Sequence, residues 1–423
     1  MKKLLCTLLF AISLFHTSLL AQWVQQSVPV SKPITGIKFI NANTGWACTE
    51  NSGTPNRAYI LYTSNGGTNW IIQDSVNNAT YGAISIINSN TGYCGGYDFP
   101  SNSANLKKTT NGGLNWVLIP TPTNMGISDM QFLNVDSGWT TVGNVGADVR
   151  TTTNGGLNWI VRTSGILQQT QKIFFLNYNT GYCGAHTQLY KTTNAGLNWT
   201  LNDNYTDLVK AIFFIDNNTG WVALTGFSIR YTTNAGSNCS NQIPDPGGSG
   251  QNLEDIYFIN NQTGWAGTSY SKVYKTTNAG VNWGYQIVTG GSSRISFSDS
   301  QNGWAGKSGV LGLYHTTNGG GIILQVQNIS NITPYEFALY QNYPNPFNPR
   351  TNIKFSVSGS SSAQTFLSVF DILGREIEIL VNETLKPGSY NVDWDATNYP
   401  SGVYFYKLSA GKFSETRKMV LIK

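Results

Sequence analysis

Short apolar segments recur at regular intervals between residues 37 and 306. Each segment begins with a triplet whose outer two residues are apolar, and a Gly-Trp pair or a close variant follows it. The triplets are Ile37-Lys38-Phe39, Ile84-Ser85-Ile86, Met130-Gln131-Phe132, Ile173-Phe174-Phe175, Ile212-Phe213-Phe214, Ile256-Tyr257-Phe258 and Ile295-Ser296-Phe297. The glycines are Gly45, Gly92, Gly138, Gly181, Gly220, Gly264 and Gly303. Each segment predicts two short strands, one at the triplet and one at the Gly-Trp pair. Apolar middle residues in some triplets indicate strands that are covered on both faces.

A second marker follows each of these segments and has the form Thr-Thr-Asn-Gly-Gly-x-Asn-Trp. Its central asparagine recurs every 40 to 46 residues, at Asn65, Asn111, Asn154, Asn194, Asn234, Asn278 and Asn318. Two further strands fit in each repeat, one before the marker, such as residues 58–62, and one that opens at its tryptophan, such as Trp70. A period of this length is typical of a four-stranded propeller blade. We therefore predict an all-β chain with a seven-bladed β-propeller over residues 22–327.

The seventh copy of the marker lacks its tryptophan. It ends Asn318-Gly319-Gly320-Gly321, and no outer strand follows. The segment Trp23-Val24-Gln25-Gln26, near the other end of the chain, has the pattern of the strand that follows the marker elsewhere. We predict that this segment completes blade seven and closes the ring. Copy five also departs from the pattern, with Cys239 in place of the tryptophan.

Residues 1–21 have the pattern of a secretory signal peptide. Met1-Lys2-Lys3 precedes an apolar run from Leu4 to Leu20, and Ala21 is a small residue that suits signal peptidase. No later stretch approaches the ~20 apolar residues of a membrane-spanning helix. We therefore expect an exported protein without a transmembrane helix, which passes through the periplasm and is either secreted or held at the outer cell surface.

Composition excludes several classes of function. Charged residues make up only 11% of the chain, the net charge is +5, and the Lys and Arg residues form no long run, so nucleic-acid binding is not expected.

Four cysteines remain after the signal: Cys48, Cys94, Cys183 and Cys239. Cys94 and Cys183 hold the same position in the second and fourth repeats, too far apart to bridge, so we interpret the cysteines as small buried apolar residues. No spacing of Cys and His indicates a metal, and no cofactor is predicted.

The repeated marker resembles the Asp-box of sialidase-like propellers, with asparagine in place of aspartate in all seven copies. An Asn side chain can bond nearby backbone N–H groups and glycine permits positive φ, so a role in folding is favoured over a calcium site built from neutral amides. Residues 22–325 also resemble the seven-bladed photosystem II stability and assembly factor family. That resemblance implies the architecture, because an exported protein has no reason to meet photosystem II.

Residues 336–423 follow a short linker, residues 328–335, and contain neither marker. Motifs along this tail resemble the type A sorting domain of the type IX secretion system; the residues that carry the likeness include Pro344, Asn345, Pro346, Gly374, Arg375, Gly402, Tyr404 and Lys418. The resemblance implies recognition by the type IX machinery and then release or covalent anchoring. Alternating strands, such as residues 351–357, 366–370, 390–394 and 403–408, predict a small antiparallel sandwich. The alternative is an accessory immunoglobulin-like domain with a ligand of its own.

Four charged residues stand at one position just before the apolar triplets. Asp129 and Asp255 hold it in repeats three and six, and Lys172 and Arg294 hold it in repeats four and seven. We expect them at the mouth of the central channel, as either a ligand site or a solvated rim.

A glycoside hydrolase, sialidase-like or active on β-glucan, would need two carboxylates ~5 to 10 Å apart. No residue is assigned a catalytic role, and the favoured hypothesis is a binding or structural module for polysaccharide or protein.

Overall fold

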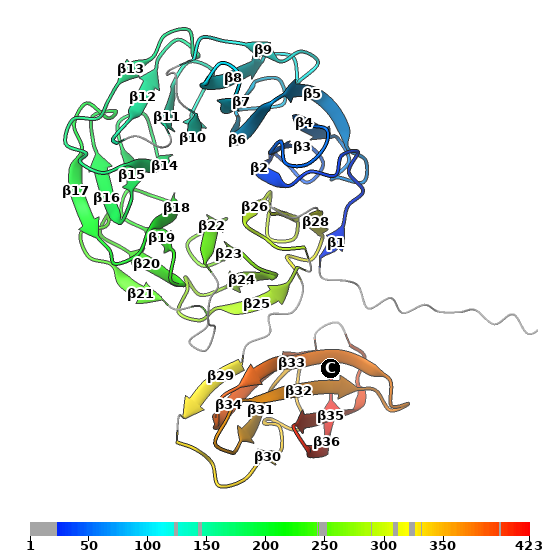
Figure 1. The fold of residues 1–423 in the computed structure, drawn as a ribbon. Helices are drawn as coiled ribbons and strands as arrows, with labels where there is room; N and C mark the ends of the chain where they lie inside the picture. The colour runs from blue at the N-terminus through cyan, green and yellow to red at the C-terminus, as the bar shows by residue number, and fades with distance from the viewer. Residues whose placement is uncertain are drawn as a thin grey trace, which may run out of the picture.

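A computed structural model describes residues 23–423 except for residues 122–125, 143–145, 243, 245–251, 289, 308–311, 321–325, 331 and 397–398. The expected signal peptide, residues 1–21, lies outside the described residues. Nine four-stranded antiparallel sheets form the fold: seven are arranged as a ring and two form a separate sandwich (Figure 1). The predicted all-β class, with a seven-bladed propeller and a small sandwich, is confirmed.

Each blade runs from an innermost strand at the channel to an outermost strand at the rim (Figure 1). Blade 1 contains β2 (Ile34–Phe39), β3 (Gly45–Thr49), β4 (Arg57–Thr63) and β5 (Ile71–Asn77). Blade 2 contains β6 (Ala79–Ile86), β7 (Gly92–Asp98), β8 (Ser103–Thr109) and β9 (Val117–Leu118). Blade 3 contains β10 (Ile127–Phe132), β11 (Gly138–Val142), β12 (Val149–Thr152) and β13 (Ile160–Val161). Blade 4 contains β14 (Thr170–Phe175), β15 (Gly181–Ala185), β16 (Gln188–Thr192) and β17 (Thr200–Asn204).

The remaining three blades follow the same plan. Blade 5 contains β18 (Val209–Phe214), β19 (Gly220–Leu224), β20 (Ser228–Thr232) and β21 (Ser240–Gln242). Blade 6 contains β22 (Leu253–Phe258), β23 (Gly264–Thr268), β24 (Lys272–Thr276) and β25 (Gly284–Ile287). Blade 7 contains β26 (Arg294–Phe297), β27 (Gly303–Gly306), β28 (Leu313–Thr316) and, as its outermost strand, β1 (Val24–Gln25).

The first strand of the described residues therefore closes the ring, as predicted. Val24 pairs with His315 and Gln25 pairs with Tyr314, so β1 and β28 lie side by side in one sheet (Figure 1). The missing tryptophan of the seventh marker is replaced by Trp23, which is buried. A propeller that joins its two chain ends in one blade must break that sheet in order to open.

Aromatic stacking between neighbouring blades explains why the Gly-Trp segment recurs. The aromatic residue of one blade stacks face to face on the phenylalanine that ends the innermost strand of the next blade, with ring centroids 3.4 to 3.8 Å apart. The pairs are Tyr93–Phe132, Trp139–Phe175, Tyr182–Phe214, Trp221–Phe258, Trp265–Phe297 and Trp304–Phe39. The preceding glycine lies under the phenylalanine of its own blade: a Cβ on Gly45 would come within 2.4 Å of the Phe39 ring. The propeller core thus consists of apolar layers between blades.

The repeated marker is a closed set of local hydrogen bonds. In the first copy the Thr63 hydroxyl donates to the Asn65 side-chain oxygen, and the same oxygen accepts the backbone N–H of Asn69. The Gly67 N–H donates to the Thr63 hydroxyl oxygen, and Gly67 has a φ of +91°. The asparagine oxygen makes the same bonds in copies two to six. This arrangement supports the role in folding that the sequence favoured.

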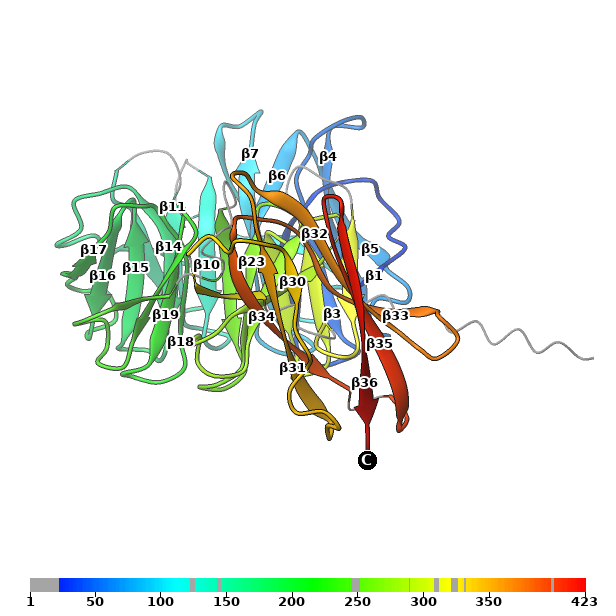
Figure 2. The ribbon, with the colours of Figure 1, turned by 90° about the horizontal axis from the view of Figure 1, so that it is seen from below.

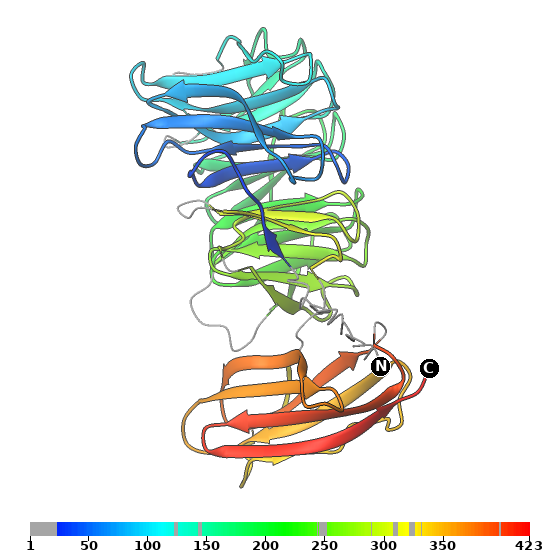
Figure 3. The same ribbon diagram turned by 90° about the vertical axis from the view of Figure 1, so that its right-hand side faces the viewer.

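The C-terminal sandwich has two sheets that enclose one apolar core (Figures 2 and 3). One sheet has the order β29 (Val326–Ser330), β34 (Gly388–Asp395), β31 (Arg350–Val357) and β30 (Ala338–Leu339). The other has the order β33 (Glu376–Leu385), β32 (Ala363–Phe370), β35 (Gly402–Ala410) and β36 (Phe413–Leu421). Buried Trp394 and Tyr406 are among the largest residues of the core.

The sandwich begins earlier than the sequence suggested. Strand β29 spans the expected end of the propeller and the expected linker, and it pairs with β34, with Val326 opposite Val392 and Ser330 opposite Ser389. Strand β29 contains neither the apolar triplet with its Gly-Trp pair nor the Thr-Thr-Asn-Gly-Gly marker. Its backbone pairs with β34 of the tail, so the linker predicted at residues 328–335 is partly a strand of the sandwich.

Candidate functional site

The four charged residues predicted at the channel occupy equivalent positions on the innermost strands. Asp129, Lys172, Asp255 and Arg294 each stand three residues before the end of β10, β14, β22 and β26, which surround the centre of the ring (Figure 1). In the first six blades a register shift comes immediately before this position. Such a bulge changes the direction of the next side chain, which explains how a strand packed on both sides can present a charged residue.

Both aspartates join neighbouring blades. Asp255 Oδ1 accepts the backbone N–H of Ile256 at 2.9 Å, and its Oδ2 accepts the N–H of Ile295, on blade 7, at 3.0 Å. Asp129 repeats the arrangement one half of the ring away, with Oδ1 bonded to Met130 and Oδ2 bonded to Ile173 on blade 4. Both oxygens of each carboxylate are therefore engaged by backbone donors. Hydrogen bonds to a charged group contribute about 1.5 to 3 kcal/mol each, so the bonds to Ile173 and Ile295 help to hold neighbouring blades together.

The two cations at this strand position, Arg294 and Lys172, act on the charge of Asp255. Burial raises the pKa of Asp255, while the charges of Arg294 and Lys172 and the two backbone bonds act in the opposite direction. Arg294 itself is anchored, because its Nε donates to the Thr35 carbonyl at 2.9 Å and its Nη1 donates to the Ser293 carbonyl at 2.7 Å. The structure thus brings three of the four predicted residues into one electrostatic group, and the fourth, Asp129, braces the blade that carries Lys172.

Sequence reasoning missed one member of this group, Lys38. Its Nζ lies 5.7 Å from the centre of the Tyr257 ring. Burial lowers the pKa of Lys38, and the charge of Asp255 opposes this shift. The middle residue of an apolar triplet gave no reason to expect a charged group in the channel. The signal that could have revealed it is that this triplet alone has a lysine in the middle position.

The other middle residues of the triplets also join blades, in two chemically distinct ways. Ser296, Ser85 and Gln131 accept the backbone N–H of the last residue of the next innermost strand, at 2.6 to 3.0 Å. Phe174, Phe213 and Tyr257 instead make aromatic contacts with one another, with ring centroids 5.4 to 5.7 Å apart. One arc of the channel is therefore polar and the opposite arc is aromatic.

The predicted sorting residues lie mostly at one end of the sheet β33-β32-β35-β36. Gly374 and Arg375 belong to a turn in which Arg375 Nε donates to Asp371 Oδ2 at 2.7 Å. These bonds, which include the backbone N–H groups of Arg375 and Leu373, hold the pKa of Asp371 below its usual range. Asn345 Oδ1 accepts the N–H of Val420 at 2.9 Å, and so ties the loop of Pro344 and Pro346 to the last strand.

Three further sorting residues lie on the last two strands. Gly402 begins β35, and Tyr404 points into the core and donates its hydroxyl to the Pro400 carbonyl at 2.7 Å. Lys418 is exposed on β36, directly opposite Phe405.

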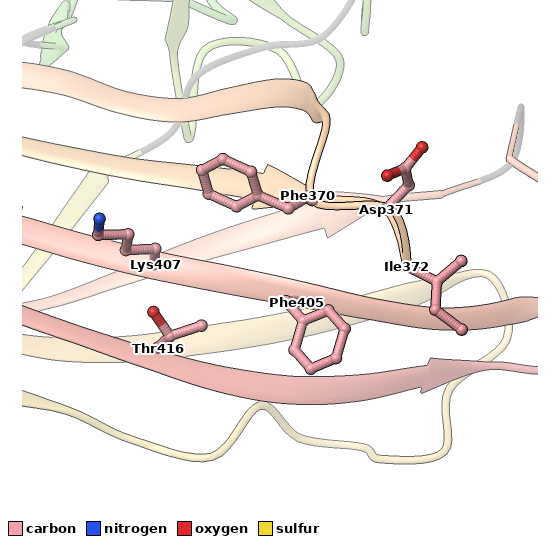
Figure 4. Close-up of a pocket in the computed structure, with 7 residues that line it drawn as sticks. Phe370, Asp371, Ile372, Phe405, Lys407 and Thr416 are labelled. Atoms are coloured by element: carbon pink, nitrogen blue, oxygen red, sulfur yellow. The ribbon is translucent and has the colours of Figure 1, made fainter.

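A shallow pocket of about 290 Å³ opens beside this turn, on the outer face of the same sheet (Figure 4). It is lined by Phe370, Asp371, Ile372, Gly374, Phe405, Lys407 and Thr416. The Ile372 side chain is 70% exposed and the adjoining Leu373 is 74% exposed. Exposed aliphatic and aromatic groups beside a fixed turn are suited to contact another protein.

Two features are absent from the described residues: a helix that could cross a membrane and a cluster that could hold a metal ion. Among residues 23–423, outside the gaps given above, we find no helical segment with the length and hydropathy that a membrane crossing requires. Nor do the described residues gather three His, Cys, Asp or Glu side chains into a group that could hold a metal ion.

Comparison with known proteins agrees with this description of two parts. Residues 341–423 match the model of the secretion system C-terminal sorting domain, which implies export to the cell surface or secretion and engagement with the secretion machinery. Residues 16–315 match the model of the photosynthesis system II assembly factor YCF48. No curated protein matches the chain.

Solved structures with the same fold are distant in sequence. YCF48 bound to D1 peptide is 17% identical, with a TM-score of 0.57 over 70% of this chain and 97% of that one. YCF48 from Cyanidioschyzon merolae is 16% identical, with a TM-score of 0.56 over 71% of this chain and 99% of that one. PorZ of Porphyromonas gingivalis, described as an essential surface component of the type IX secretion system, is 14% identical, with a TM-score of 0.51 over 94% of this chain and 61% of that one. The match over most of the propeller places the chain in the photosynthesis system II assembly factor YCF48 family, and its tail is a secretion system C-terminal sorting domain.

Proposed function

We propose that this protein is a non-catalytic binding module, exported through the periplasm by a signal peptide at residues 1–21 and displayed or released by the type IX secretion system. Its propeller binds a polysaccharide or protein ligand. The observation that carries the proposal is that both carboxylate oxygens of Asp129 and of Asp255 accept backbone N–H groups, one in the same strand and one in the neighbouring blade. These carboxylates are the pair on which the glycoside hydrolase alternative would depend.

Two comparisons support a protein ligand. A propeller of the same fold is known in complex with a peptide, and another is a surface component of the secretion system. In this chain, Lys38, Lys172 and Arg294 are each electrostatically coupled to Asp255, and an aromatic arc formed by Phe174, Phe213 and Tyr257 lines the same channel. Cations and aromatic rings together suit an acidic peptide or an acidic sugar.

The test is binding of the full mature chain to glycan and peptide arrays, with product analysis of each bound sugar. We expect binding without cleavage, and we expect Lys38→Ala and Lys172→Ala to weaken it about tenfold each. Lys412→Ala is the matched control, because Lys412 is an exposed lysine of the sandwich. Cleavage of a bound sugar would overturn the proposal in favour of the hydrolase.

The sorting role is tested separately by fusing residues 326–423 to a periplasmic reporter in a host that has a type IX system. We expect the reporter to reach the surface or the medium. Ile372→Asp and Leu373→Asp should reduce export, because both side chains are exposed beside the pocket and neither contributes to the core. Full export of both variants would show that this face is not the contact surface.

A further inference from the structure

The interface between blades 1 and 2 contains two cysteines. Cys48, on β3, is paired in register with Gly36, and Cys94, on β7, is paired with Ile84. The Cβ position of Gly36 lies 2.9 Å from Cys48 Sγ and 3.0 Å from Ile84 Cγ2, so the Cys48 sulfur reaches the strand that pairs directly with Cys94. Both cysteines are fully buried in one apolar cluster, close enough that each thiol shifts the pKa of the other.

A polar cluster lies beside this pair. Burial, Cys48 and the charge of Asp74 raise the pKa of Cys94 in the folded propeller, and the charge of Lys107, opposite Cys94 on the adjacent strand β8, acts in the other direction. Asp74 Oδ2 holds this lysine at 2.5 Å and also accepts the Tyr81 hydroxyl at 2.8 Å. The thiolate is the form of cysteine that attacks a disulfide, and burial disfavours it in the folded propeller. A disulfide between these cysteines must therefore form while the thiols are still accessible.

The other two described cysteines are placed differently. Cys183 packs in the layer between blades 3 and 4, and Cys239 is half-buried in blade 5, with its Sγ 4.0 Å from the Tyr205 hydroxyl. Neither shares an apolar cluster with another cysteine in the described part of the chain. They are internal controls for any measurement on the blade 1–2 pair.

We propose that Cys48 and Cys94 form a disulfide that crosses the interface between blades 1 and 2 in the exported protein. The proposal rests on the proposed passage through the periplasm, a compartment in which disulfides persist. It also revises the interpretation of both cysteines as inert apolar residues. That interpretation compared Cys94 with Cys183 and did not consider the neighbouring blade.

The reaction is a two-step exchange with an external disulfide, such as that of a periplasmic dithiol–disulfide oxidoreductase. The Cys94 thiolate attacks the external disulfide, which breaks its S–S bond and gives a mixed disulfide and one external thiolate. The Cys48 thiolate then attacks the Cys94 sulfur and releases the second external thiolate. Two electrons pass from the cysteine pair to the oxidant, and the two protons lost by the cysteines are taken up by the two external thiolates. Because both sulfurs are buried in the folded propeller, the exchange takes place before blade 2 packs on blade 1.

The test uses the full mature chain, unfolded and reduced, then refolded with glutathione disulfide as the oxidant. The product is alkylated in denaturant without reductant, digested and analysed by mass spectrometry. We expect the peptides of Cys48 and Cys94 as one cross-linked species, in roughly tenfold excess over their alkylated forms, and alkyl groups on Cys183 and Cys239. A reductant added before alkylation should abolish the cross-linked species. Alkylation of all four cysteines would overturn the proposal.

The same mapping on protein recovered from the surface or medium of a type IX host does not depend on refolding. A cross-linked pair there supports the proposal, and a reduced pair on exported protein overturns it while leaving the proposed function intact. Failure of export combined with a cross-linked refolded chain would instead count against the proposed function alone. Cys94→Ala is the chemical control, because it should leave Cys48 fully alkylated.

Discussion

Trp23 meets Phe297 edge-on, with ring centroids 5.9 Å apart and an interplanar angle of 88°. The marker tryptophans of other blades meet the phenylalanine of their own innermost strand in the same way, at 5.8 to 6.0 Å. Trp23 Nε1 also donates to Gln286 of blade 6, just as Trp70 Nε1 donates to Gln26. The first residues of the described chain therefore supply blade seven with its tryptophan and supply blade one with a hydrogen-bond partner.

Replacing this tryptophan should destabilise the whole ring. We expect Trp23→Ala to lower the free energy of unfolding of the propeller by about 3 to 5 kcal/mol, because a buried indole and its contact with Phe297 are lost. Denaturant unfolding followed by tryptophan fluorescence or circular dichroism measures the effect. Val24→Thr is the control: Val24 is 55% exposed, so the change should stay within about 0.5 kcal/mol. Equal midpoints for both variants would mean that β1 does not contribute to closure.

The closing blade should also be sensitive to acid through His315. Burial lowers the pKa of His315 to about 4, below the ordinary value of ~6.5, and the ring stacks on Trp304 with ring centroids 4.6 Å apart. The unfolded chain therefore binds a proton that the folded chain excludes, and stability is lost as the pH falls from about 6.5 towards 4. We expect His315→Tyr to reduce this loss, since Tyr62 and Tyr231 fill the equivalent position in blades 1 and 5. Melting temperatures of both proteins between pH 7.5 and 4 are the measurement; parallel curves would contradict the assignment.

The asparagine of the marker should tolerate aspartate but not alanine. Asn194 Oδ1 accepts two hydrogen bonds, from the Thr192 hydroxyl and from the Asn198 N–H. A carboxylate keeps both acceptors, so Asn194→Asp should change stability by less than about 0.5 kcal/mol, whereas Asn194→Ala should cost about 1 to 2 kcal/mol. Chemical denaturation of the two variants beside the wild type decides the point. A loss from aspartate as large as that from alanine would show that a side-chain donor is essential at this position.

Asp255 should give a pH dependence opposite to that of His315. Its pKa in the folded chain is raised, so the folded state binds the carboxyl proton more tightly than the unfolded state does. Stability of the wild type relative to Asp255→Asn should therefore increase as the pH falls from the raised value towards ~3.9, the ordinary carboxyl pKa. The difference in unfolding free energy between the two proteins, followed from pH 7 downwards, measures this. A wild-type advantage that shrinks with acid would mean that the cations around Asp255 outweigh its burial.

Much of the fold could be predicted because the chain repeats itself. The glycine under Phe39 and the aromatic residue after it recur in every blade, so even the blade completed by Trp23 was identified from an incomplete copy. Strand β29 was missed because it carries neither marker, and it finds its partner only in the tail.

The site was harder to predict than the fold. The sequence placed Asp129 and Asp255 at equivalent positions, but a side chain that bonds the next blade and one that faces a ligand look alike in a linear pattern. Lys38 was hidden in a triplet that otherwise serves packing. Cys48 and Cys94 differ by one position in their repeats, so only the meeting of neighbouring blades reveals that they are adjacent.

Ring closure by the earliest strand sets an order of events during synthesis. Strand β1 is made before the other described strands, yet its partner β28 is made only after six complete blades. Until then the propeller cannot complete its last sheet, and the ring stays open. The same pairing that stabilises the finished ring thus postpones its completion until most of the chain has emerged.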